Sequence, residues 1–146
     1  MSLSHMWIQN DGNAKISLGW QVFPELYGDD RTHLYASWTN DNYHKTGCYN
    51  VQCPGFIQID RKIYIGAPFI HSSSYGGQIY VYIHLLNQGP LSKNWWLSVK
   101  NYDIGYFPTK LLSNLKMGVK VRYYGDVRES LHCFLQFGGP DGNSEN

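Results

Sequence analysis

The feature of this sequence that most constrains its fold is the alternation of apolar with polar or small residues over short stretches. The clearest case runs from residue 15 to residue 23. One set of alternate positions is apolar and is expected to face a core: Ile16, Leu18, Trp20 and Val22. The other set is Ser17, Gly19, Gln21 and Phe23. We interpret this second set either as the wall of a cleft that a ligand backbone approaches closely or as a row facing solvent.

Similar stretches predict strands at 3–8, 32–39, 95–100, 104–107 and 119–124. Between residues 78 and 86 we expect Ile79, Val81, Ile83 and Leu85 to face inward and Gln78, Tyr80, Tyr82 and His84 outward. Asp60 and Arg61 are expected to form a tight hairpin turn between 55–59 and 62–66. Only Thr109 to Met117 has helical spacing. The prediction is an all-β chain, an antiparallel β-sandwich with one short helix.

Two cysteines, Cys48 and Cys53, lie five positions apart and are followed at once by Pro54 and Gly55. A loop of this length lets the two sulfurs meet, and its closure would remove about 2 kcal/mol of unfolded-chain entropy. The same spacing also occurs in half of a zinc site. Because no second Cys or His pair has metal spacing, we favour a disulfide, provided that the compartment is oxidising.

Composition excludes several classes of function. The formal net charge is +1, so charge gives no reason to expect binding to nucleic acid or to an anionic membrane. No apolar run approaches the roughly 20 residues of a membrane helix. The six histidines show no metal-binding spacing, so we expect no metal and no cofactor. Residues 1–10 have no basic start and no apolar run, and are not expected to be a signal peptide.

Several motifs together resemble the neprosin family, secreted, plant-rich glutamic peptidases that cleave at proline. They are Gly47-Cys48-Tyr49-Asn50 with Cys53-Pro54-Gly55-Phe56, Gly19-Trp20-Gln21-Val22, Ser73 to Gly77, Asn94 to Leu97 and Ile104 to Pro108. The resemblance implies one β domain over residues 1–139, without the family's signal peptide, propeptide and first strands, and a flexible tail at 140–146. It also implies an extracellular location.

The resemblance identifies the two positions at which the family has its catalytic glutamates. This chain has no glutamate at either position. One ionised carboxylate activates water and a second, protonated acid donates to the carbonyl oxygen. Ser17 stands at the first glutamate position. The second glutamate matches either Arg122 or Asp126, depending on the alignment of 122–127 with the family's stretch. Either match breaks the acid pair, so we expect peptidase activity to be weak or absent.

The residues expected to line the cleft are Gly19, Gln21, Tyr75 and Trp95. Trp95 and Trp96 are adjacent on a predicted strand, so one indole is expected in the core and the other on the cleft side. The expected partner is a peptide or a proline-rich protein. A second hypothesis is a non-catalytic module that binds cell-wall polysaccharide or proline-rich protein through exposed aromatic rows that include Tyr80 and Tyr82. A third is a non-functional gene remnant.

Overall fold

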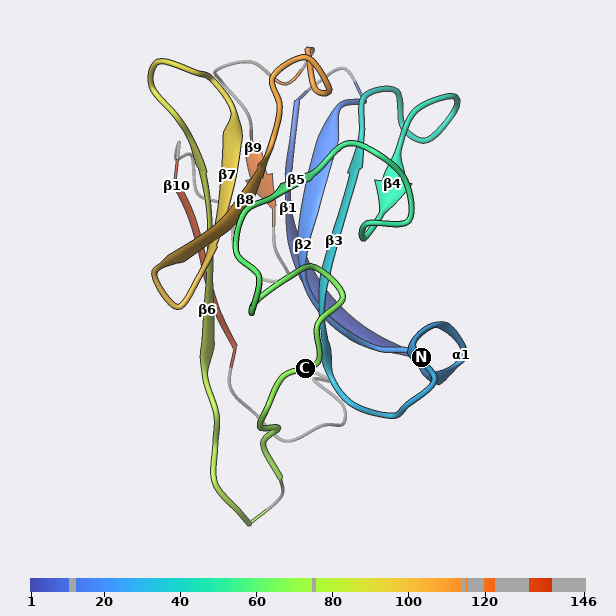
Figure 1. Ribbon diagram of the computed structural model, residues 1–146, viewed down its shortest axis with the longest axis vertical. Helices are drawn as coiled ribbons and strands as arrows, with labels where there is room; N and C mark the ends of the chain where they lie inside the picture. The colour runs from blue at the N-terminus through green and yellow to red at the C-terminus, as the bar shows by residue number, and fades with distance from the viewer. Residues whose placement is uncertain (11–12, 75, 114, 116–119, 123–131, 138–146) are drawn as a thin grey trace.

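Two five-stranded antiparallel sheets form the protein, as shown by a computed structural model (Figure 1). The structure describes residues 1–10, 13–74, 76–113, 115, 120–122 and 132–137. Sheet A has the order β4-β3-β2-β1-β9 and sheet B the order β10-β6-β7-β8-β5. The predicted all-β sandwich is therefore confirmed.

The strands of sheet A are β1 (Ser2–Gln9), β2 (Lys15–Val22), β3 (His33–Thr39), β4 (Cys48–Tyr49) and β9 (Lys120–Arg122). Those of sheet B are β5 (Ile57–Gln58), β6 (Tyr82–Gln88), β7 (Trp95–Val99), β8 (Tyr102–Phe107) and β10 (His132–Phe137). Consecutive strands β1, β2 and β3 pair along nearly their whole length. The C-terminal segment thus contributes one edge strand to each sheet.

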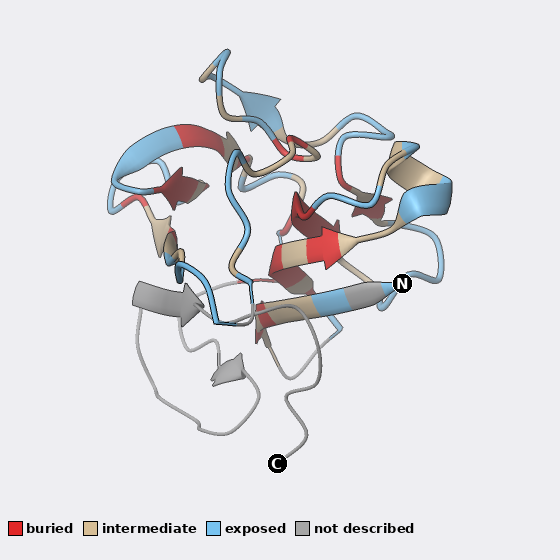
Figure 2. Cartoon of the chain, turned by 90° about the horizontal axis from the view of Figure 1, so that it is seen from below, coloured by how far each residue is buried: buried red, intermediate tan, exposed pale blue. Residues whose placement is uncertain are grey.

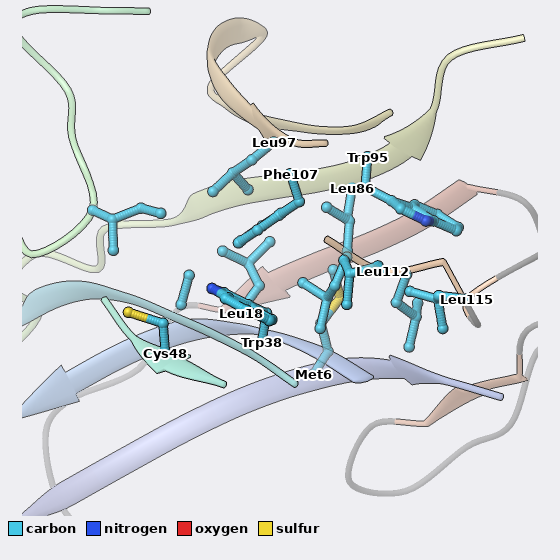
Figure 3. Close-up of a cluster of buried hydrophobic side chains, with 14 of the residues drawn as sticks. Met6, Leu18, Trp38, Cys48, Leu86, Trp95, Leu97, Phe107, Leu112 and Leu115 are labelled. Carbon is cyan, nitrogen blue, oxygen red and sulfur yellow. The ribbon is translucent and has the colours of Figure 1, made fainter. Parts of the chain in front are cut away.

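The core lies between the two sheets, where the apolar rows of both meet (Figure 2). From sheet A it receives Met6 and Ile8 of β1, Ile16 and Leu18 of β2, and Leu34, Ala36 and Trp38 of β3, and from sheet B residues of β6, β7 and β8. In Figure 3 Leu97 and Phe107 point toward Leu18 and Trp38 across this layer. Ile16 and Leu18 are 0% and 1% exposed. The inward set predicted for β2 is therefore confirmed at these two positions.

The helix lies elsewhere than predicted. Residues 109–113 form turns with three-residue hydrogen-bond spacing, for example from Leu112 N–H to the carbonyl of Thr109, 3.2 Å. Leu112 and Leu115 still reach the core. The helix is α1 (Pro24–Tyr27), in a segment whose Pro, Gly and Asp residues are typical of a loop. Pro24 stands at its start, where a missing N–H costs nothing, and Gly28 ends it with a left-handed backbone.

The hairpin expected at Asp60 and Arg61 does not form, because Ile57–Gln58 pairs with β8 instead. Asp60 Oδ1 accepts hydrogen bonds from the backbone N–H groups of Lys62 and Ile63, at 2.7 and 2.8 Å. The Gln58 side chain donates to the carbonyls of Asp60, Ile63 and Ile104. These local bonds satisfy the turn, so residues 62–66 do not need a strand partner.

The orientation predicted for β6 is reversed. Ile79 and Val81 are 62% and 40% exposed, whereas His84 and Leu86 are buried at 1% each. The ring faces of Tyr80 and Tyr82 are stacked on His71 and Phe69. These two tyrosines are thus packed against the preceding segment and do not form a free row of rings.

Candidate active-site face

One cross-strand row crosses the middle of sheet A and contains Ser17. Its residues, taken in the order of the paired strands β9, β1, β2, β3 and β4, are Arg122, Trp7, Ser17, Ser37 and Tyr49. Directly opposed residues share a face of a sheet. Since Ile16 and Leu18 point into the core, Ser17 points away from it. We call this side the outer face, formed by His5 and Trp7 of β1, Ser17, Gly19 and Gln21 of β2, His33, Tyr35 and Ser37 of β3, and Tyr49 of β4.

The outer face is not an ordinary solvent-facing row. Ser17, Gln21 and Ser37 are only 2%, 1% and 2% exposed. These small or polar residues are therefore covered by neighbouring side chains. The sequence allowed two interpretations of the second row of β2, a cleft wall or a row facing solvent. The burial of Ser17 and Gln21 contradicts the second interpretation.

Gly19 allows β1 and β2 to approach closely at the centre of this face. A Cβ there would overlap the carbonyl oxygen of Ser4 and lie 2.6 Å from the Cα of His5. Both atoms are backbone, so neither can rotate away.

We therefore expect Gly19→Ala to destabilise the protein by about 2 kcal/mol or more, since overpacking against a fixed neighbour typically costs 1–3 kcal/mol. Urea unfolding followed by tryptophan fluorescence measures the change. Ser17→Ala, two positions along the same strand and on the same side, is the matched control and is expected to change stability by less than about 1 kcal/mol. Equal stability of Gly19→Ala and the parent protein would contradict this packing.

Three hydroxyl groups form a chain beside Ser17. The hydroxyl of Tyr35 is 2.8 Å from Ser37 Oγ, which in turn is 2.9 Å from the hydroxyl of Tyr43. The Lys15 ammonium lies 5.6 Å from the centre of the Tyr43 ring, within the range of a cation–π contact. Burial raises the pKa of Tyr35, so its hydroxyl stays protonated at neutral and acidic pH. This side of the face therefore offers hydroxyls and a cation.

A second network surrounds Gln21. Its Oε1 accepts hydrogen bonds from the hydroxyl of Tyr49 and, at 3.3 Å, from that of Tyr27. The Tyr27 hydroxyl also accepts a 2.7 Å bond from Asn50 Nδ2. Burial raises the pKa of Tyr49 to about 12, partly offset by its bond to Gln21. Both tyrosines are therefore neutral donors at ordinary pH.

At the end of β3, His33 links three segments of the chain. Its Nδ1 lies 2.8 Å from the carbonyl oxygen of Gly66 and its Nε2 lies 2.8 Å from Asp29 Oδ1, while Tyr27 stacks on the ring at 3.8 Å. Asp29 also binds Arg31. The hydrogen bonds from Arg31, and then from His33, hold the pKa of Asp29 well below its usual range. The Asp29 carboxylate is thus already paired with Arg31 and His33 in the folded protein.

The carboxylates that hydrogen-bond to this side of β3 within the described ranges lie at its two ends. Asp29 binds His33 at one end, and Asp41 binds Thr39 at the other, where it also accepts bonds from Thr46. No described carboxylate is hydrogen-bonded to Ser17 or to its cross-strand neighbours Trp7 and Ser37. The described part of the face therefore holds no acid pair at its centre.

Nucleophilic catalysis by Ser17 finds no support either. A serine nucleophile needs a base within hydrogen-bond reach. No hydrogen bond joins Ser17 to a histidine among the described residues. His5, the histidine of this face on β1, is opposite Gly19, and its Nδ1 is buried without a described partner. Burial, and then the charge of Lys15, lower the pKa of His5.

The structure brings together some of the predicted site residues and separates others. Ser17, Gly19 and Gln21 share the outer face. Arg122 occupies the same register row as Ser17, two strands away, which corresponds to a Cα separation of about 10 Å. Trp95 was expected to line the cleft, but it is 1% exposed and belongs to the core, so that expectation is corrected. Tyr75 and Asp126 lie outside the described residues.

Sequence reasoning missed Asn50, Tyr27 and Tyr49 as parts of the site. A signal was present, because Tyr49 and Asn50 belong to the cysteine motif. Their side chains, however, reach β2 only through the pairing of β4 with β3. Tyr27 lies on α1, a four-residue helix that no periodic pattern predicts. No local pattern places these residues next to Gln21.

The cysteine loop is closed by a disulfide between Cys48 and Cys53. This confirms the disulfide and excludes the zinc half-site for these two residues. The described residues contain no group of three or more His, Cys, Asp or Glu side chains suited to a metal ion. Nor do they include a helix with the length and apolar character needed to cross a bilayer.

A model of the protein family described as Neprosin matches residues 1–139. The match covers nearly the whole chain and includes both sheets. It agrees with the family suggested by the motifs around Trp20 and Cys48.

Proposed function

Since this chain belongs to the neprosin family, we propose that it is a peptide-binding domain of that family whose hydrolytic activity is absent or strongly reduced. The observation that carries the proposal is the position of Ser17. It lies at the buried centre of the outer face, where the resemblance places a catalytic glutamate, and no described carboxylate is hydrogen-bonded to it or its neighbours. A hydroxyl with a pKa far above neutrality cannot replace a carboxylate as general base.

The position of Arg122 supports the proposal. The second catalytic acid of the family was matched to Arg122 or to Asp126. Arg122 is in the cross-strand row of Ser17, the row in which a pair of acids could act on one substrate. We take Arg122 as the counterpart of the second glutamate. Both acids are then replaced, one by a neutral group and one by a cation.

Retention of peptide binding is supported by the rest of the face. The buried Gln21 and the hydroxyls of Tyr35 and Ser37 offer hydrogen bonds to an extended backbone. The partner we propose is a proline-containing peptide or a proline-rich protein. An extracellular location fits the disulfide, which persists in oxidising compartments. Binding to wall polysaccharide through Tyr80 and Tyr82 is less favoured, because both rings are already stacked.

Incubation of the protein with a fluorescein-labelled hexapeptide of alternating alanine and proline tests this proposal. At acidic pH we expect the labelled peptide to bind, as measured by fluorescence anisotropy, and to remain intact by mass spectrometry over a day. Gly19→Ala, which perturbs the face, serves as a control for the site of binding. Efficient cleavage that is lost in Asp126→Asn would overturn the proposal, because it would show a working acid at position 126.

A further inference from the structure

The chain that leads into β6 extends past the end of its neighbour β7. The pairing of these strands reaches the turn after Val99, where the N–H of Lys100 donates to the carbonyl of Ile83 at 3.0 Å. Residues 78–82, which we call the edge segment, come before this bond and project past the turn between β7 and β8 (Figure 1). On the β7 side the described part of the chain therefore places no strand beside them.

On its other side the edge segment packs against the chain that precedes it. Phe69 stacks on Tyr82 and His71 stacks on Tyr80, at 4.2 and 4.8 Å between ring centres. Ser73 Oγ accepts a 2.8 Å hydrogen bond from the N–H of Tyr80 and donates to the Tyr80 carbonyl oxygen at 3.3 Å. The backbone groups of Tyr80 are therefore occupied on this side.

The backbone N–H and C=O groups of Ile79 and Val81 point to the β7 side. In an extended chain these groups alternate from one side to the other, and Tyr80 uses the side opposite to β7. No described residue forms a hydrogen bond with the backbone of Ile79 or Val81. Their side chains are 62% and 40% exposed. The edge segment thus has a free β-edge that carries two aliphatic side chains.

The sequence gives this edge none of the usual protection against pairing. Free edges in natural proteins normally carry a lysine, another charged side chain or a proline, which prevents a second strand from pairing with them. The edge segment, Gln78-Ile79-Tyr80-Val81-Tyr82, has none of these. No Asp, Glu, Lys or Arg occurs anywhere between residues 63 and 92, although charged residues make up 16% of the chain. A second strand can therefore approach this edge without charge repulsion.

The edge segment is complementary to a second copy of itself. When two copies run antiparallel with Tyr80 opposite Tyr80, Ile79 of each lies opposite Val81 of the other. These residues then exchange both backbone hydrogen bonds, and their aliphatic side chains pair on one face. The pairing ends where Gly77 of one copy would meet Ile83 of the other, whose carbonyl is already bonded. A proline-rich strand fits this edge poorly, because proline has no N–H to donate.

We propose that the edge segment is a self-association site, through which two copies of this chain form a two-fold symmetric dimer by antiparallel pairing of residues 78–82. Each copy uses the same residues, so the contact closes at two copies. Two strands of this length bury less than the roughly 1,200 Å² at the lower end of stable interfaces, so we expect a weak dimer with a Kd of about 100 μM. The inference does not depend on peptide binding at the outer face of sheet A.

Sedimentation velocity of the full chain at concentrations from about 10 μM to about 500 μM tests the association. We expect the parent protein to shift from monomer to dimer across this range. Ile79→Lys and Val81→Lys each place two ammonium groups in the paired edge of one dimer, so each is expected to raise the Kd at least about tenfold. Leu91→Lys makes the same change at an aliphatic residue that is 95% exposed outside the edge segment, and is expected to leave the Kd unchanged within about twofold.

Cysteine cross-linking tests the register of the pairing. Tyr80→Cys places two thiols opposite each other across the two-fold axis, at a Cα separation of about 4.5 Å, which a disulfide can span. Gln78→Cys, on the same strand, places them about 13 Å apart along the paired strands. Both variants carry Cys133→Ser, so that the introduced thiol is the one outside the Cys48–Cys53 disulfide. After mild oxidation at about 200 μM protein we expect a covalent dimer from Tyr80→Cys, at least about tenfold more than from Gln78→Cys, on a non-reducing gel.

A parent protein that stays monomeric over the whole concentration range would overturn the proposal. So would a dimer that Leu91→Lys weakens as much as Ile79→Lys does, since the association would then not depend on this edge. Equal cross-linking of Gln78→Cys and Tyr80→Cys would contradict the register, and oligomers larger than two would contradict a contact that closes on itself.

Discussion

Replacing Ser17 and Arg122 together with glutamate is expected to create peptidase activity that neither single replacement gives. Ser17 and Arg122 share a register row of sheet A, two strands apart. Carboxylates at both positions would be close enough to raise the pKa of one of them by like-charge repulsion. One acid would then be ionised and activate water, and the other would be protonated and donate to the carbonyl oxygen. General acid–base catalysis of this kind contributes about 10²–10⁴-fold to a rate.

We therefore expect cleavage of the alanine–proline hexapeptide by Ser17→Glu/Arg122→Glu to be at least about a hundredfold faster than by either single variant. Mass spectrometry of the products between pH 2.5 and pH 6 measures the rate. The rate should be highest on the acidic side, because it requires one of the two acids to be protonated. Ser17→Gln/Arg122→Gln has nearly the same shapes without acids and is expected to be inactive.

The same experiment distinguishes the two alignments of the second glutamate. If Ser17→Glu alone becomes active and loses this activity on Asp126→Asn, then Asp126 is the second acid and our assignment of Arg122 is wrong. If the double variant is stable and binds the peptide but stays inactive, the row of Ser17 and Arg122 is not the catalytic pair. Both results are visible with one substrate and four variants.

The orientation of β2 could be predicted because its two rows differ in chemistry. Ile16 and Leu18 are large and apolar, whereas Ser17 and Gly19 are neither, so burial of one row in the core follows from the pattern. On β6 both alternate rows contain large apolar residues. Which row is buried therefore depends on the packing of sheet B and not on the pattern of the strand itself. Leu86 reaches the core, and His84 follows it on the same side. A buried histidine contradicts its usual preference, so the pattern predicted the wrong face.

Only the part of the site that lies on a single strand could be predicted from the sequence. The motif around Trp20 placed Ser17, Gly19 and Gln21 on one row, and the structure keeps them together. The partners of Gln21 come from α1 and from the disulfide loop, which are distant in sequence and have no periodicity. Trp95 was assigned to the cleft because two adjacent tryptophans must point to opposite sides of a strand. Which of the two is buried depends on the packing of sheet B against sheet A.

Acidification is expected to destabilise the protein through His84. This residue is 1% exposed, and neither ring nitrogen has a hydrogen-bond partner among the described residues. Its surroundings are apolar: Phe69 lies 6.0 Å away between ring centres, and Val99 is its cross-strand neighbour on β7. The ammonium of Lys100, which follows Val99 in the chain, lies 4.4 Å from the centre of the Tyr82 ring. Burial lowers the pKa of His84 to about 4, so the ring is neutral in the folded protein at neutral pH.

In the unfolded chain the same ring has a pKa of about 6.5. Between the two values the unfolded state binds more protons than the folded state, so the free energy of unfolding falls as pH falls from about 6.5 to about 4. The loss is of the order of 3 kcal/mol, a large part of the 5–15 kcal/mol of a typical domain. The pKa of His5 is lowered too, and adds a smaller loss of the same sign. Asp29 affects stability at lower pH, because its contribution to the free energy of unfolding is lost only below about pH 4.

His84→Leu is expected to remove most of this pH dependence and to raise stability at pH 5, because an apolar side chain neither takes up a proton nor leaves buried nitrogens unpaired. Urea unfolding at pH 7, 6, 5 and 4 gives the slopes. His44→Gln removes an exposed histidine and is the matched control, expected to keep the slope of the parent protein. A parent protein equally stable at pH 7 and pH 4.5, or a His84→Leu variant with an unchanged slope, would show that His84 has contact with water or with a proton acceptor. The core between β6 and sheet A would then admit more water than the packing of Leu86, Leu97 and Ile104 indicates.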